Sequence, residues 1–165
     1  MSNYKVFDLN QDQLQAGQAR YAIVAARFND HIVGPMLDAA VKTLQERGAT
    51  EEQIEVSRVP GAFELAVTAQ HYANTGHYQA IICLGCVIRG DTPHFDYVCE
   101  AATQGLTEVS LKTNLPIIFG VLTTDNEQQA LDRSGAKPGE NKGVDAAMTA
   151  MEMVAVCQRI DQQDR

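Results

Sequence analysis

Short runs of apolar, largely β-branched residues alternate along the chain with longer segments in which apolar residues recur every three or four positions. The short runs predict four strands, at residues 20–26, 54–59, 80–87 and 116–122. Most of these runs lack regular polar alternation, which is typical of parallel strands covered by helices on both faces.

The remaining periodic segments predict amphipathic helices. Apolar positions mark them at residues 33–44, 63–71, 95–112, 126–133 and 144–160. Gly48 and Gly76 are placed to end the first two helices, and the methionines and small residues of the last are interpreted as packing residues. Because strand and helix alternate four times, the predicted class is α/β: a three-layer α/β/α sandwich around a four-stranded parallel sheet.

Length and charge narrow the range of functions. We expect one domain over residues 1–165, with residues 1–19 as an N-terminal arm, since 165 residues of which 45% are hydrophobic can bury a core. The net charge of -8, without a block of Lys or Arg, argues against nucleic-acid and membrane partners. The start lacks a signal-peptide pattern, and no apolar run approaches the roughly 20 residues of a membrane span, so we expect a cytoplasmic protein with reduced cysteines.

In open α/β sheets, ligands bind beyond the carboxyl ends of the strands. Three segments would lie there, at residues 27–30, 60–64 and 88–96. Phe28 and Phe63 lie at such strand ends, where an aromatic ring can stack on a planar heterocycle, although each ring taken singly is more typical of a core residue. The three segments therefore predict a site, with two aromatic candidates.

The third segment carries the most chemical content. Gly90 permits close approach of the backbone, and the helix that follows presents free N–H groups and a positive dipole end to an anion such as phosphate. Thr92 could contribute to that anion site or could instead cap the helix, with Pro93 at its first position. Among four histidines, only His94 lies at a strand-to-helix junction, where an imidazole can donate and accept a proton.

Three other segments argue against nucleotide and zinc sites or leave their role open. The first strand-to-helix turn, RFNDHIVG, has neither the Gly-x-Gly pattern of dinucleotide sites nor a P-loop lysine. Cys83 and Cys86 match a C-x-x-C pattern that, with His94 and Cys99, would suggest zinc, but the pair lies in a predicted buried strand and packing is favoured. The Gly- and Pro-rich residues 134–143 form either a functional loop or a plain connection between helices.

Taken together, six segments within residues 21–156 resemble the signatures of the 6,7-dimethyl-8-ribityllumazine synthase family, in the same order and at similar spacing. They are ARFN at 26–29, VPGAFE at 59–64, LGCVIRG at 84–90, HFDYV at 94–98, FGVLTT at 119–124 and NKG at 141–143. The resemblance implies a flavodoxin-like strand order. It also implies a transferase of riboflavin biosynthesis that condenses 5-amino-6-ribitylaminouracil with 3,4-dihydroxy-2-butanone 4-phosphate and uses no cofactor or metal.

The same resemblance implies roles for individual residues. His94 corresponds to the catalytic proton donor. The butanone phosphate would contact Asp91, Thr92 and Arg133. The ribitylaminouracil would contact Phe28, Ala62, Phe63, Glu64, Cys86, Val87, Ile88, Phe119 and Lys142.

Assembly is also implied by the resemblance. Family members form homopentamers, some of which build sixty-subunit icosahedral shells, and the sites lie between adjacent subunits, with Phe119, Arg133 and Lys142 supplied by one of them. Riboflavin synthase is an implied partner, and the N-terminal segment is expected to add a strand to a neighbouring subunit. Two positions depart from the family pattern, an extra Glu140 before NKG and an acidic Asp91 near the phosphate. The alternative functions are an archaeal-type riboflavin synthase and a non-catalytic flavin- or lumazine-binding shell protein.

Overall fold

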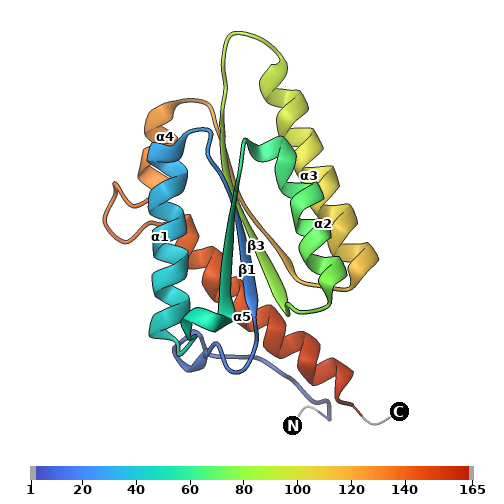
Figure 1. Ribbon diagram of the computed structural model, residues 1–165. Coiled ribbons are helices and arrows are strands. Elements are labelled where there is room, and N and C mark those ends of the chain that lie inside the picture. Colours follow the sequence, from blue (N-terminus) through green and yellow to red (C-terminus); the bar gives the residue numbers. More distant parts are fainter. Residues whose placement is uncertain (1–2, 164–165) are drawn as a thin grey trace.

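The computed structural model describes residues 3–163 as a four-stranded parallel sheet between two layers of helices (Figure 1). The strands are β1 (Tyr21–Ala26), β2 (Ile54–Val59), β3 (Ala80–Ile88) and β4 (Ile117–Thr124). Their spatial order is β2-β1-β3-β4, and every neighbouring pair is parallel. The predicted three-layer sandwich and its flavodoxin-like strand order are therefore confirmed.

Helices cover both faces of the sheet. Their bounds are α1 (Asp30–Glu46), α2 (Leu65–Thr75), α3 (His94–Thr113), α4 (Glu127–Arg133) and α5 (Lys142–Asp161). Helices α1 and α5 pack together on one face with α4 beside them, and α2 and α3 pack together on the other (Figure 1). Short 3-10 turns occupy Gln11–Gln13, Glu51–Gln53 and Ala62–Glu64.

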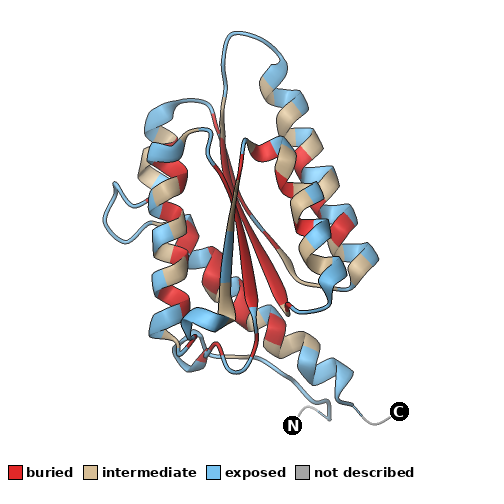
Figure 2. Ribbon diagram, viewed as in Figure 1, coloured by how far each residue is buried: buried red, intermediate tan, exposed pale blue. Residues whose placement is uncertain are grey.

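The core consists of two apolar layers, one on each side of the sheet. All six residues of β1 are buried, as Figure 2 shows for the central strands, because β1 is flanked by strands on both sides and by helices on both faces. Edge strand β2 is only partly buried, and Val56 is 40% exposed. Among the described residues, no helix is both long and apolar enough to cross a membrane.

The predicted elements are all present, and their ends differ from the predicted ones by a few residues. Strand β3 continues to Ile88 and β4 to Thr124, beyond the apolar runs. Phe63 belongs to the 3-10 turn before α2 rather than to the helix itself. Gly76 ends α2 in the left-handed conformation (φ 73°), which a residue without Cβ adopts at little cost, as predicted.

The second half of the N-terminal arm is anchored to the domain. Leu14 is buried, and its carbonyl oxygen accepts a hydrogen bond from the Arg47 guanidinium at 3.1 Å. Gln53 donates from its side-chain amide to the carbonyl oxygens of Gly17 and Ala19, at 2.9 Å and 2.7 Å. The described part of the arm forms no strand within the chain, so its expected pairing with a neighbouring subunit stays a prediction.

Candidate active site

Backbone hydrogen bonds hold the carboxyl ends of β1 and β2 together. The Arg27 N–H donates to the Val59 carbonyl oxygen at 2.7 Å, and the Phe28 N–H donates to that of Pro60 at 3.0 Å. The parallel ladder therefore continues past the strand ends and places the first two predicted segments side by side. Phe28 is 70% exposed and Phe63 66% exposed, so the interpretation of these rings as core residues is wrong.

Asn29 connects the first segment to the third. It adopts the left-handed conformation (φ 61°), which an Asn tolerates better than most residues, and directly precedes α1. Its side-chain amide donates to the Cys86 carbonyl oxygen at 3.0 Å. This contact fixes the turn that carries Phe28 against the end of β3. Asn29 belongs to the ARFN segment of the family resemblance, but no role was predicted for it.

Cys83 and Cys86 contribute to opposite core layers. Cys83 packs in the layer under α2 and α3, whereas Cys86 packs in the layer under α1 and α5, because side chains three positions apart on a strand point to opposite faces. Burial raises the pKa of Cys83 to about 12 and that of Cys86 to about 11. Both are therefore packed neutral thiols, and they cannot ligate one metal ion together.

The segment from Ile88 to His94 rises from the end of β3 to the start of α3. Asp91, Thr92 and His94 are all exposed on it. The Thr92 hydroxyl accepts a hydrogen bond from the His94 backbone N–H at 3.4 Å, but the residue at the cap position of α3 is Pro93 and no side chain caps the helix, so the alternative of Thr92 as the cap is wrong. Pro93 precedes the first helical residue rather than occupying that position. His94 thus begins α3 with its side chain open to solvent.

Arg89 holds the base of this segment. Its guanidinium Nε lies 3.0 Å from Asp125 Oδ1, and Nη1 lies 3.5 Å from Asp96 Oδ1. The same guanidinium lies over the Phe95 ring, 4.4 Å from the centroid, and the Arg89 N–H donates to the Thr124 carbonyl oxygen at 2.8 Å. The hydrogen bond that the guanidinium donates to the Asp125 carboxylate raises the pKa of Arg89 above its ordinary value. Arg89 therefore joins the ends of β3 and β4 to the first turn of α3.

The side chains after β2 complete this end of the sheet. Ala62 is buried, and Glu64 is partly buried beside it on the 3-10 turn. Val87 and Ile88, the last residues of β3, are partly buried against the two core layers. Phe28, the residues at 62–64 and those at 86–94 therefore all lie at the carboxyl end of the sheet.

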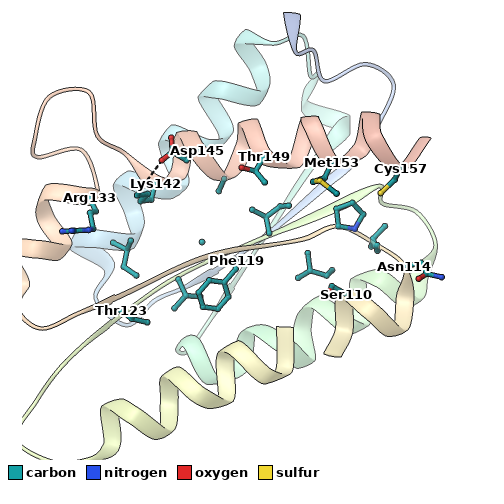
Figure 3. A pocket seen from close by; sticks show the side chains of 18 of the residues that line it. Ser110, Asn114, Phe119, Thr123, Arg133, Lys142, Asp145, Thr149, Met153 and Cys157 are labelled. Atoms are coloured by element: carbon teal, nitrogen blue, oxygen red, sulfur yellow. Dashed lines mark hydrogen bonds and ion pairs between the residues drawn. The ribbon is translucent and has the colours of Figure 1, made fainter. Parts of the chain in front are cut away.

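The other predicted residues lie in a separate groove of about 1000 Å³ along the free edge of β4. Figure 3 shows Phe119 in the middle of this β4 groove, with Arg133 and Lys142 toward one end and Cys157 toward the other. Arg133 donates to the Gln129 carbonyl oxygen at 2.9 Å. The Lys142 ammonium lies 3.2 Å from Asp145 Oδ2, a partner that was not predicted from the sequence.

The extra Glu140 is accommodated before the helix. Its carboxylate lies 3.4 Å from the Lys137 ammonium within the loop. Asn141 then caps α5, since its side-chain oxygen accepts from the Gly143 N–H at 2.8 Å. Lys142 is consequently the first residue of α5 and lines the β4 groove.

The predicted site residues thus fall into two groups on one chain. Phe119, Arg133 and Lys142 line the β4 groove, and none of the predicted residues at the carboxyl end of the sheet lines it. The first group offers cations and an exposed ring, while the second offers exposed aromatic rings, a helix N-terminus and an imidazole.

Comparison with known proteins identifies the family of the chain. The model of the 6,7-dimethyl-8-ribityllumazine synthase family matches residues 18–158, which include both groups. A 6,7-dimethyl-8-ribityllumazine synthase of Desulfatibacillum aliphaticivorans is 51% identical over 146 residues, covering 88% of this chain and 94% of the relative. The chain therefore belongs to the 6,7-dimethyl-8-ribityllumazine synthase family, and it is a transferase of riboflavin biosynthesis that condenses 5-amino-6-ribitylaminouracil with 3,4-dihydroxy-2-butanone 4-phosphate.

Proposed function

We propose that the condensation takes place between two adjacent copies of the chain, one supplying the carboxyl-end residues and the other supplying the β4 groove. The observation that carries this proposal is the separation of the two groups. Arg133 and Lys142 open onto the free edge of β4, in a groove that no carboxyl-end candidate of the same chain lines. A second copy seated against that edge would bring the groups together and complete a site that one chain leaves divided.

The ribitylaminouracil binds mainly to the carboxyl-end copy. Phe28 stacks on the pyrimidine, which agrees with a ring that is 70% exposed beside the end of the sheet. Ala62, Phe63 and Glu64 line the same pocket, with Glu64 accepting hydrogen bonds from ribityl hydroxyls. The backbone of Cys86, Val87 and Ile88 forms its floor. Phe119 and Lys142 of the other copy close the pocket.

The butanone phosphate binds at the start of α3. A 20-residue helix presents a positive dipole end and free N–H groups there, which suit a phosphate dianion. Thr92 contributes its hydroxyl, and Asp91 contributes its backbone N–H while its carboxylate points to solvent. Arg133 of the other copy supplies the bidentate guanidinium that a phosphate requires in this chain of net charge -8.

His94 acts as the general acid and base. The substrate amine attacks the ketone and water leaves to form an imine, then phosphate is eliminated, and ring closure with loss of a second water yields the lumazine. Each step moves a proton, and His94 lies exposed at the first residue of α3, beside the phosphate position. Holding two substrates together supplies much of the acceleration, on the order of 7–11 kcal/mol.

The assembly proposed for this site is a homopentamer, in which every copy gives its β4 groove to one neighbour and its carboxyl-end residues to the other. Packing of twelve pentamers into a shell, association with riboflavin synthase and strand addition by the N-terminal arm belong to the same proposal. Residues 1–165 would act as one domain. The buried thiols of Cys83 and Cys86 suit a reducing compartment such as the cytoplasm.

The reaction is tested by mixing the purified protein with both substrates while recording lumazine absorbance and phosphate release. We expect equal amounts of both products, at a rate above the spontaneous one and only when both substrates are present. Turnover of lumazine alone to a flavin would favour the riboflavin synthase alternative. Tight lumazine binding without turnover would favour the non-catalytic shell protein.

A further inference from the structure

The Arg89 side chain contacts residues of two different segments at the carboxyl end of the sheet, although the proposed function gives it no role. Its side chain reaches two carboxylates, Asp125 after β4 and Asp96 in the first turn of α3, at 3.0 Å and 3.5 Å. Its guanidinium also lies over the ring of Phe95, the residue after His94. Arg89 thus stands at the start of the exposed segment that carries Asp91, Thr92 and His94 and contacts Phe95 and Asp96 at its end, as well as Asp125 after β4.

Hydrogen bonds also hold Asp125 and the backbone of Arg89 in place. The Asp125 N–H donates to the Gln129 side-chain oxygen at 2.8 Å, which anchors Asp125 to α4. The backbone of Arg89 is held by the Thr124 carbonyl oxygen at 2.8 Å. Arg89 is therefore a fixed point to which the first turn of α3 is attached, whereas the residues between them are exposed.

We infer that Arg89 is a positioning residue, which orients the 90–94 segment so that its phosphate-binding groups and His94 face the same substrate. This inference rests on the proposed function, because it concerns the segment to which that function assigns the phosphate and the proton transfer. Arg89 does not contact the substrate itself. It acts through Phe95 and Asp96, which begin the helix that carries His94.

The contacts of Arg89 depend on the planar, forked shape of its guanidinium. An arginine can pair with two carboxylates and stack on a ring at once, whereas a lysine ammonium is a compact point charge without a planar face. Arg89→Gln removes both ion pairs and the stacking. Arg89→Lys retains the charge and can pair with one carboxylate, so it should recover part of the function.

Steady-state kinetics with each substrate varied in turn test the inference. We expect Arg89→Gln to raise the KM for the butanone phosphate and to lower kcat, each by about 10- to 100-fold, because small misplacements of reacting groups have effects of this size. The KM for the ribitylaminouracil should stay within about twofold, since the contacts of Phe28 remain. Arg89→Lys and Asp125→Asn should give intermediate values. Thermal unfolding should change little, because exposed ion pairs contribute little to stability.

Arg159→Gln is the matched control. Arg159 also lies over a phenylalanine ring, that of Phe7, at 4.8 Å, but on α5 and the N-terminal arm. Its variant should retain wild-type values of kcat and both KM. Equal changes in the two KM values of Arg89→Gln, or wild-type kinetics in that variant, would overturn the positioning role.

Titration with inorganic phosphate, followed by calorimetry, separates this inference from the proposed function. We expect Arg89→Gln to bind phosphate about 10-fold or more weakly than the wild type, whether or not either protein turns over substrate. A wild-type protein without turnover, combined with this weakened binding, would reject the proposed function and support the role of Arg89. If the wild type turns over substrate and Arg89→Gln shows unchanged phosphate binding and kinetics, the proposed function is supported and the role of Arg89 is rejected.

Discussion

His94 lies exposed at the first residue of α3, and the proposed function assigns it the transfer of protons to and from the substrate. We expect His94→Ala to lower kcat by about 10²- to 10⁴-fold, which is the usual contribution of general acid and base catalysis. Activity above the spontaneous rate should remain, because the variant still holds both substrates together. Lumazine formation at saturating substrate measures the effect. His77→Ala, on an exposed histidine after α2, is the control, and full turnover by His94→Ala would exclude the assigned role.

Tyr21 is a buried residue whose ionisation should affect stability at high pH. Its hydroxyl donates to the Ala16 carbonyl oxygen at 3.1 Å, and burial raises its pKa to about 12, from about 10 in the unfolded chain. The contribution of Tyr21 to the free energy of unfolding is therefore fully present below pH 10 and is lost as the pH rises toward 12, because the unfolded chain releases the hydroxyl proton more readily.

Tyr21→Phe isolates this contribution. At pH 7 we expect the variant to lose about 1 kcal/mol of unfolding free energy, the typical value of one buried hydrogen bond. Between about pH 10 and 12 the wild type should lose stability more steeply than the variant, so that the difference narrows. Urea unfolding at fixed protein concentration measures both effects. Parallel pH curves for the two proteins would contradict the assignment.

Individual residues were predictable where their place along the chain decides their environment. The packed position of Cys83 followed from a buried strand, whereas Phe28, which taken singly is typical of a core residue, is exposed at a strand end. The partners of Arg89 did not follow, because Asp125 lies 36 positions away and meets it only once two loops have adopted their conformations. The same holds for the contact between Asn29 and Cys86, which are 57 positions apart.

At the scale of elements, the crossing of α1 and α5 depends on a glycine. A Cβ atom at Gly143 would lie 2.0 Å from the Met36 carbonyl oxygen, so the two helices would have to move apart. We expect Gly143→Ala to destabilise the protein by about 1–3 kcal/mol, as overpacking does. Urea unfolding of the purified variant measures the change.

Gly34→Ala is the matched control for this substitution. It lies within α1, and its Cβ would have Asp30 Oδ1 as nearest neighbour at an ordinary 3.6 Å. Because alanine is the better helix former, we expect this variant to gain about 0.5–1 kcal/mol. A Gly143→Ala variant as stable as Gly34→Ala would show that the helices can move apart without cost.

The elements themselves were predictable because periodicity reports burial. Strands β1 and β3 are buried throughout most of their length and therefore read as continuous apolar runs. The edge strand β2, which pairs with β1 alone, is only partly buried and reads as IEVSRV. An exposed aromatic residue just before a helix has the same sequence spacing as a buried residue on the apolar face of that helix. Phe63 was therefore predicted as part of the helix, although it lies in the 3-10 turn that precedes it.

At the scale of the whole molecule, the division of the site could not be predicted from the residue pattern. Its two groups come from strand ends and from a sheet edge, and only the strand order β2-β1-β3-β4 makes β4 an edge. The rule for open sheets predicted the carboxyl-end group. Arg133 and Lys142 were predicted only from the resemblance to the family. The match of the family model to residues 18–158 confirms that resemblance.

A site divided between copies predicts that two defective variants can repair each other. His94→Ala disables the carboxyl-end group, and Arg133→Ala disables the β4 groove. When the two variants are co-expressed in equal amounts and assemble at random, about a quarter of the interfaces combine an intact His94 with an intact Arg133. We expect the mixed assembly to recover about a quarter of wild-type activity, far above the mean of the separate variants. The same variants purified apart and mixed without subunit exchange are the control. If activity in the co-expressed assembly equals that mean, each site must draw His94 and Arg133 from the same copy.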